Sequence, residues 1–167
     1  MGTGKTVVAK ALARDLGMKY VSTDDLIEAR EKKPIKDIFK DQGEPYFRKV
    51  EKEVVGQIGE KADQVIDAGG GVVLDEKNIE NLRKNGVIIC LWADLDTIYE
   101  RTVKHGHRPL LNVEDPKKRI EELMEYRSPF YEKADIHINT ADLDVNGVVK
   151  LIKGLMADEK EDERKES

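Results

Sequence analysis

Short apolar runs rich in β-branched residues alternate with longer helical patterns along this chain, and this alternation limits the folds open to it. Strands are expected at 19–22, 64–68, 87–92 and 135–139. Apolar residues recur at helical spacing in the segments 5–16, 23–33, 34–41, 45–60, 75–85, 95–104, 116–127 and 144–156. Strands that alternate with helices predict an α/β fold of three layers, in which helices cover both faces of a parallel sheet.

The chain opens with MGTGKT and passes directly into the first expected helix. GxGK[ST] at the start of a helix is the second half of a phosphate-binding loop. Its glycines let backbone amides turn toward phosphate oxygens, Lys5 would reach the outer phosphates, and the Thr6 hydroxyl would bind Mg²⁺. The residues expected to bind a nucleotide here are Gly2, Thr3, Gly4, Lys5 and Thr6. The alternative is an ordinary glycine-rich turn.

The full pattern of such a loop, GxxxxGK[ST], contains an earlier glycine and follows a buried strand. In this chain that glycine would fall before Met1, and so would the strand. The sequence therefore predicts a chain that begins inside the loop and lacks its first strand.

Polar and glycine-rich clusters follow two of the expected strands, at the edge where parallel sheets bind ligands. STDD at 22–25 places Asp24 and Asp25 at the start of a helix, where capping of the helix is a sufficient alternative explanation. AGGG at 68–71 allows a small ligand to approach the backbone closely, unless it is only a flexible loop. Arg48 and Glu51 share a helical face, which by itself indicates no more than a weak surface ion pair.

Taken together, the motifs GTGKT, TDDLIE, FRKVE, GGG, RPLL and YRSPFY resemble those of shikimate kinases in order and spacing, over residues 1–156. The resemblance implies a P-loop kinase fold related to the nucleoside monophosphate kinases, in which the strand before the phosphate loop is central in a five-stranded sheet. Without that strand, four parallel strands and marginal stability are expected. The implied reaction is the transfer of the γ-phosphoryl group of ATP to the 3-hydroxyl of shikimate, on the route to chorismate and the aromatic amino acids.

The resemblance also implies roles for individual residues. Asp24 would bind the attacking hydroxyl and accept its proton, and Arg48 and Arg127 would hold the shikimate carboxylate. Glycines of the loop would line the ring: Gly69, Gly70 and Gly71. Lys5 and Arg108 would stabilise the transferring phosphoryl group, with Arg108 in a lid at about 104–115. Arg101 matches a position that stacks on adenine, although an exposed helical arginine would look the same in sequence.

One departure from the family concerns the metal. Shikimate kinases usually carry an aspartate where this chain has Ser22, and that aspartate helps to hold hydrated Mg²⁺. Asp67, at the end of the expected strand 64–68, is the candidate replacement, since P-loop proteins often place a magnesium-steadying aspartate at a strand end. Thr6 and Asp67 are therefore the expected metal ligands.

Composition restricts partners and location. The net charge of −5 and pI of about 5.4 provide no positive field for nucleic acid. No apolar run approaches the length of a membrane helix and no signal segment is evident, so a cytoplasmic monomer is expected. The charged segment 157–167 is expected to be a disordered tail.

Two other functions stay open. A kinase for another small acceptor, such as gluconate or a nucleoside monophosphate, would share the loop and the lid. A truncated P-loop module that binds nucleotide without turnover is the second alternative. The pocket residues FR at 47–48, GGG at 69–71 and YRSP at 126–129 favour a small carboxylated ring as acceptor.

Overall fold

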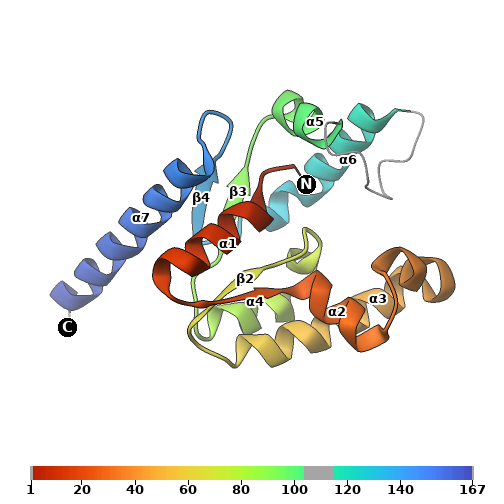
Figure 1. The fold of residues 1–167 in the computed structure, drawn as a ribbon, viewed down its shortest axis with the longest axis horizontal. Helices are drawn as coiled ribbons and strands as arrows, with labels where there is room; N and C mark the ends of the chain where they lie inside the picture. The colour runs from red at the N-terminus through yellow and green to blue at the C-terminus, as the bar shows by residue number, and fades with distance from the viewer. Residues whose placement is uncertain (1, 104–114, 167) are drawn as a thin grey trace.

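The computed structural model describes residues 2–103 and 115–166, with the backbone alone given over 158–166. Figure 1 shows helices on both sides of the strands. The helices are α1 (Lys5–Leu16), α2 (Thr23–Glu31), α3 (Ile35–Gly59), α4 (Glu76–Arg83), α5 (Leu95–Val103), α6 (Pro116–Tyr131) and α7 (Val145–Glu166). The strands are β1 (Lys19–Ser22), β2 (Gln64–Asp67), β3 (Ile89–Trp92) and β4 (Ile136–Asn139), and a 3-10 turn, η1 (Val72–Leu74), follows β2.

Local sequence accounts for several helix ends. α1 ends at Gly17, whose φ of 65° is the left-handed conformation that glycine adopts without strain. The Ser22 hydroxyl caps α2 by accepting a hydrogen bond of 3.1 Å from the Asp25 amide. α3 is interrupted at Gly43 (φ 80°, ψ 172°), which confirms the expected break between helical segments 34–41 and 45–60.

The four strands form two parallel pairs. β1 pairs with β2 in a register that places Ser22 opposite Asp67, and β3 pairs with β4. In the described part of the chain, β2 and β3 are not hydrogen-bonded to one another, and no other strand lies between them. Two cavities of about 370 and 280 Å³ lie between them: the smaller is lined by both strands, the larger by β3 and by residues directly after β2. The expectation of four parallel strands is confirmed within the described residues.

Three apolar clusters hold the layers together. The largest joins α1, β4 and α7 through residues such as Val8, Ile138 and Ile152. A second packs α2 against α3 around Ile27 and Phe47, and a third joins α5 and α6. The α2–α3 unit and the α5–α6 unit therefore have separate cores, with the strand pairs between them (Figure 1).

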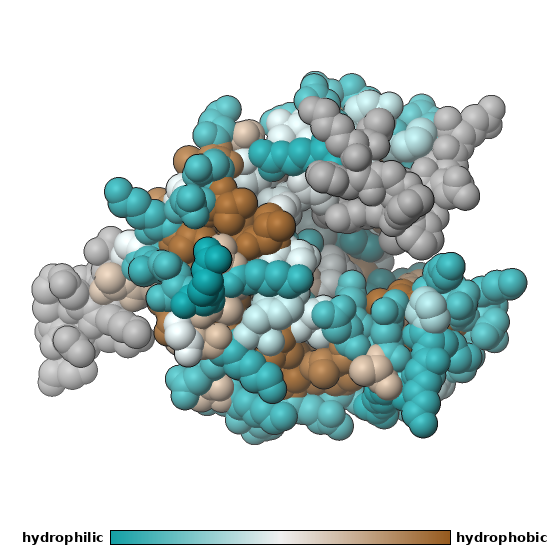
Figure 2. All heavy atoms as spheres, viewed as in Figure 1, coloured by the Kyte–Doolittle hydropathy of each residue, from teal (hydrophilic) through white to brown (hydrophobic). Residues whose placement is uncertain are grey.

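The outer surface is mainly polar. Figure 2 shows hydrophilic side chains over most of one face, with hydrophobic residues in smaller separate areas. No helix in the described part of the chain has the length and apolar character that crossing a membrane requires.

The C-terminal segment differs from expectation. α7 continues past the predicted end at residue 156 as far as Glu166, so the backbone of the expected disordered tail is helical in the structure. Its sequence places Glu161 four residues before Lys165, a spacing that supports helix.

Candidate functional site

The phosphate loop lies at the start of α1, and its backbone needs glycine. Gly2 and Gly4 have φ angles of 70° and 82°, and Gly4 is the N-cap of α1 without a side-chain cap. A Cβ atom on Gly2 would lie 2.9 Å from the Thr102 hydroxyl, so this position is also sterically restricted to glycine. The uncapped amides of the first turn and the helix dipole therefore make this segment suited to bind an anion.

The adjoining residues tie the loop to the opposite strand pair. The Thr140 hydroxyl, just after β4, donates a hydrogen bond of 3.3 Å to the carbonyl of Thr3, which is buried. Arg101 donates to the hydroxyl and carbonyl of Thr140 at 3.1 and 2.8 Å and to the Ala141 carbonyl at 3.2 Å. The guanidinium of Arg101 is therefore held beside the phosphate loop, and the alternative of a freely exposed helical arginine is wrong.

Thr6 and Asp67 meet across the sheet edge. The Thr6 hydroxyl donates a hydrogen bond of 2.6 Å to Asp67 Oδ2, and the Tyr20 hydroxyl donates to the same oxygen at 3.2 Å. The burial of Tyr20 and the negative charge of Asp67 raise the pKa of the Tyr20 phenol to about 12, which keeps it a donor at neutral pH. A hydroxyl and a carboxylate that face one another provide the oxygen ligands that Mg²⁺ prefers.

Asp24 lies at the N-terminal end of α2, with its side chain open to the site. The surrounding protein atoms exclude enough water to raise the pKa of its carboxyl group, and the charge of Asp67 raises that pKa further, while Lys5 opposes the shift. Asp24 therefore interacts electrostatically with residues of the phosphate loop and of β2. Ser22 is the N-cap of α2, so Asp24 is not the capping residue, and its place in the first turn also suits the helix dipole.

Each glycine of the loop after β2 lies directly beneath a different candidate side chain. A Cβ on Gly69 would lie 2.9 Å from Asp24 Oδ1, and one on Gly71 would lie 2.6 Å from Arg48 Nη2. A Cβ on Gly70 would lie 3.1 Å from Arg127 Nη1. The three glycines thus allow three functional groups, from α2, α3 and α6, to converge on one loop.

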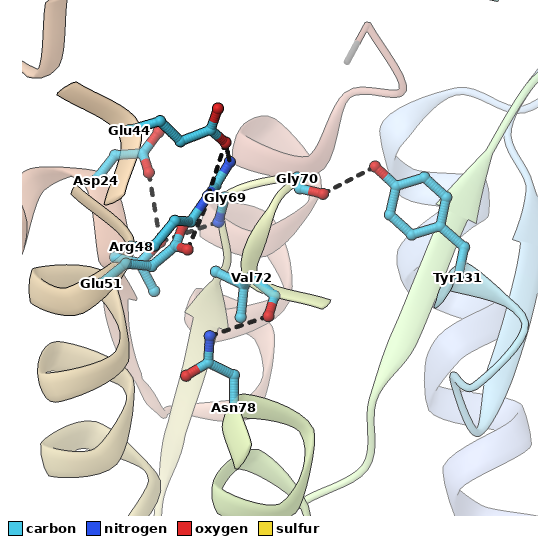
Figure 3. Close-up of polar contacts among 10 residues, drawn as sticks. Asp24, Glu44, Arg48, Glu51, Gly69, Gly70, Val72, Asn78 and Tyr131 are labelled. Carbon is cyan, nitrogen blue, oxygen red and sulfur yellow. Dashed lines mark hydrogen bonds and ion pairs between the residues drawn. The ribbon is translucent and has the colours of Figure 1, made fainter. Parts of the chain in front are cut away.

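Arg48 is held by two carboxylates (Figure 3). Its Nη1 donates to Glu51 at 2.8 Å, and its Nε and Nη2 donate to Glu44 at 3.1 and 3.0 Å. Glu51 is only 2% exposed, so the alternative of a weak surface pair is wrong. Burial raises the pKa of Glu51, and the neighbouring guanidinium of Arg48 counteracts that shift.

Arg127, in contrast to Arg48, is not held by carboxylates of the described residues. It is 9% exposed, its Nε is buried without a hydrogen-bond partner, and no ion pair holds it among the described residues. A buried guanidinium with an unsatisfied donor is costly unless a ligand completes its hydrogen bonds. Arg127 borders the larger cavity together with Gly69, Gly70 and Tyr131.

Three further side chains, which the sequence pattern did not single out, fix the glycine loop. The buried Thr23 hydroxyl accepts a hydrogen bond of 2.9 Å from the Gly69 amide, and the Tyr131 hydroxyl donates to the Gly70 carbonyl at 3.0 Å. The side-chain amide of Asn78 donates to the Val72 carbonyl at 3.0 Å (Figure 3). Thr23 and Tyr131 belong to the motifs TDDLIE and YRSPFY, which could have indicated them, whereas no sequence signal marks Asn78.

The structure therefore brings together most of the predicted site residues at one end of the strand pairs. The exception is the segment 104–114 with Arg108, the centre of the predicted lid at 104–115, which lies outside the described residues.

Comparisons with known proteins agree with this geometry. A family model described as shikimate kinase matches residues 1–156. The shikimate kinase of Thermodesulfovibrio yellowstonii is 47% identical over 152 residues, which cover 91% of this chain and 88% of that protein. The shikimate kinase of Caldanaerobacter subterraneus subsp. tengcongensis is 47% identical over 150 residues, covering 90% and 88%.

Solved structures show the same similarity. The structure of shikimate kinase from Acinetobacter baumannii in complex with shikimate superposes with a TM-score of 0.90 at 31% identity, covering 96% of this chain and 90% of that one. Shikimate kinase from Aquifex aeolicus gives a TM-score of 0.79 at 31% identity, covering 96% and 93%.

Proposed function

This chain belongs to the shikimate kinase family, and from that premise we propose which of its residues perform the reaction. The enzyme transfers the γ-phosphoryl group of ATP to the 3-hydroxyl of shikimate, a step on the route to chorismate and the aromatic amino acids. The single observation that carries the assignment of residues is the convergence of Asp24, Arg48 and Arg127 on the three glycines after β2.

The nucleotide phosphates bind at the start of α1. The uncapped amides after Gly4 and the positive end of the helix dipole attract phosphate oxygens, and Lys5 adds a full positive charge at the same place. Arg101, held by Thr140 and Ala141, borders the nucleotide on the side of β4. These groups fix the γ-phosphoryl group at the edge of the larger cavity, which Lys5 also lines.

Thr6 and Asp67 are the residues that would hold Mg²⁺. The Thr6 hydroxyl oxygen lies 2.6 Å from Asp67 Oδ2, and a bound Mg²⁺ would take this neutral hydroxyl and this carboxylate as oxygen ligands. When bound, Mg²⁺ neutralises phosphate charge as the phosphoryl group transfers. Asp67 takes the place of the aspartate expected at Ser22, because these two positions are opposite one another in the β1–β2 register.

The shikimate carboxylate binds to Arg127 and Arg48. A guanidinium donates charge-assisted hydrogen bonds to a carboxylate, and Arg127 lines the larger cavity with its Nη1 at Gly70. Arg48 is already neutralised by Glu51 and Glu44, so Arg127 contributes the larger share of the attraction.

Asp24 accepts the proton of the attacking hydroxyl. Its raised pKa makes the carboxylate a stronger base than an ordinary aspartate, and the absence of a side chain at Gly69 lets Asp24 Oδ1 lie against the glycine loop. The hydroxyl oxygen forms a bond to the γ-phosphorus while the bond from that phosphorus to the β–γ bridging oxygen breaks. The proton passes to Asp24, and ADP carries away the bridging oxygen.

The assignment is tested by measuring ADP release from MgATP with an acceptor series. Shikimate is expected to support turnover, whereas gluconate and a nucleoside monophosphate are not, because neither offers a ring carboxylate to Arg127 with a hydroxyl at Asp24. Turnover with gluconate and none with shikimate would contradict the acceptor assignment.

A further inference from the structure

The glycine loop between β2 and η1 is anchored on two sides. On one side Thr23, from α2, accepts the Gly69 amide hydrogen at 2.9 Å. On the other side Tyr131, from α6, donates its phenol hydrogen to the Gly70 carbonyl at 3.0 Å. Figure 3 shows Tyr131 reaching across to Gly70 from the side opposite Asp24 and Arg48.

Tyr131 and Arg127 act on the same glycine. They are four residues apart on α6, a spacing that places two side chains on one face of a helix. A Cβ on Gly70 would lie 3.1 Å from Arg127 Nη1 and 3.3 Å from the Tyr131 hydroxyl. The Tyr131 hydroxyl and the Arg127 guanidinium therefore lie against the same residue of the loop.

Little else among the described contacts locates Arg127. No carboxylate pairs with it, and its Nε has no partner. The last turn of α6 also contains Pro129, which has no amide hydrogen to donate to the preceding turn. The Tyr131 hydrogen bond is thus a fixed point at the end of the helix that carries Arg127.

We propose that Tyr131 is a positioning residue for shikimate, which acts by holding the Gly70 carbonyl and so fixes Arg127 relative to Asp24. The inference rests on the proposed role of Arg127 in binding the shikimate carboxylate. Gly69, next to Asp24, and Gly70, next to Arg127, are consecutive. Loss of the Tyr131 hydrogen bond would therefore let the loop move relative to both side chains.

The test is the substitution Tyr131→Phe, which removes the hydroxyl and keeps the ring. The matched control is Tyr46→Phe on α3, which also loses one tyrosine hydrogen bond, the one donated to Glu31 at 2.8 Å, away from the glycine loop. Tyr131→Phe is expected to raise the KM for shikimate about three- to tenfold, the equivalent of one lost neutral hydrogen bond. The KM for ATP is expected to stay at the parent value in Tyr131→Phe. The control Tyr46→Phe is expected to keep the parent values of kcat and of both KM constants.

A double-mutant cycle separates positioning from general destabilisation. If Tyr131 acts through Arg127, Tyr131→Phe raises the shikimate KM much less in an Arg127→Lys background than in the parent. Equal effects in both backgrounds, an unchanged shikimate KM, or an equal rise in the ATP KM would overturn the proposal. Absence of shikimate turnover by the parent chain would overturn the proposed function with it, whereas parent turnover with an unaffected Tyr131→Phe enzyme would overturn this inference alone.

Discussion

The hydroxyl of Thr6 lies 2.6 Å from Oδ2 of Asp67, a residue 61 positions further along the chain. Thr6 belongs to the first turn of α1, and Asp67 is the last residue of β2. Asp67 is also opposite Ser22 in the neighbouring strand. The carboxylate that we propose for Mg²⁺ therefore lies on β2, opposite the β1 position where the family pattern places one, and it contacts the phosphate loop.

The pairing of Ser22 with Asp67 predicts how the Mg²⁺ requirement changes when the carboxylate is removed from β2 and placed on β1. Asp67→Ala is expected to raise the Mg²⁺ concentration for half-maximal activity about 10- to 100-fold, as other losses of metal-supporting groups do. Ser22→Asp in the same chain is expected to restore most of that affinity, because aspartate also caps α2. Binding of Mn²⁺ in the presence of ADP, followed by electron paramagnetic resonance, provides a readout that is independent of turnover.

Ser22→Asp alone is the control for the double substitution, and it is expected to change the Mg²⁺ requirement little. An Asp67→Ala enzyme with the parent requirement for Mg²⁺ would show that the exchange of carboxylates does not occur.

The elements were predictable from sequence because each depends on local pattern. Gly17 ends α1 and Gly43 interrupts α3 where their positive φ angles require glycine. The site was predictable only where a motif marks it. Thr23 and Tyr131 lie inside the motifs TDDLIE and YRSPFY, but their contacts with the glycine loop follow from elements that meet only in the folded chain.

Two expectations failed for similar reasons. The burial of Glu51 beneath Arg48 depends on how α3 packs, which i, i+3 spacing does not reveal. The continuation of α7 to Glu166 runs through a segment whose charge pattern suits both a solvated helix and a disordered tail.

Removing the charge of Asp24 is expected to lower activity and to raise the thermal stability of the protein. Its pKa is raised above the ordinary value of 3.8, so the folded protein binds this proton more tightly than the unfolded chain. The protonated Asp24 carboxyl group therefore adds to the free energy of unfolding below pH 3.8, and this contribution is lost as the pH rises through the raised pKa. Asp24→Asn is expected to melt at a higher temperature than the parent at pH 7, with the difference shrinking toward pH 3.8.

The same substitution is expected to lower kcat about 10²- to 10⁴-fold, the usual contribution of a general base. In the parent, kcat/KM is expected to fall on the acid side at a pH above the ordinary aspartate range. Asp25→Asn, at the exposed neighbouring position, is the control and leaves kcat unchanged. An active Asp24→Asn enzyme would remove Asp24 from the reaction.

Gly71 is expected to tolerate no side chain. The Cβ of Gly71→Ala would lie 2.6 Å from Arg48 Nη2 and 2.7 Å from Cζ, so the guanidinium must move. The KM for shikimate is expected to rise, with little change in the KM for ATP. Gly154→Ala on α7 has open space around it and is expected to stabilise the helix by roughly 0.5–1 kcal/mol without a kinetic effect. A Gly71→Ala enzyme with the kinetics of Gly154→Ala would contradict this account of the loop.

The space between β2 and β3 predicts a gain in stability when a strand fills it. All four residues of β2 are only partly buried, and the two cavities beside the strands are lined mainly by apolar side chains such as Ile66, Ile89 and Leu91. A chain extended before Met1 by a short β-branched segment is expected to melt at a higher temperature and to protect the amides of β2 and β3 from hydrogen exchange. An extended chain with the parent melting temperature and exchange rates would show that the two strand pairs need no strand between them.

The central claim is that Asp24, the glycine loop and Arg127 orient shikimate for phosphoryl transfer at its 3-hydroxyl. The most direct measurement is ³¹P nuclear magnetic resonance of a mixture of this protein, MgATP and shikimate, with Arg127→Lys alongside. The account predicts a phosphomonoester on the shikimate 3-oxygen that appears with ADP, and much slower formation by Arg127→Lys at low shikimate concentration. Release of inorganic phosphate without a shikimate ester, from protein shown to be folded, would contradict it.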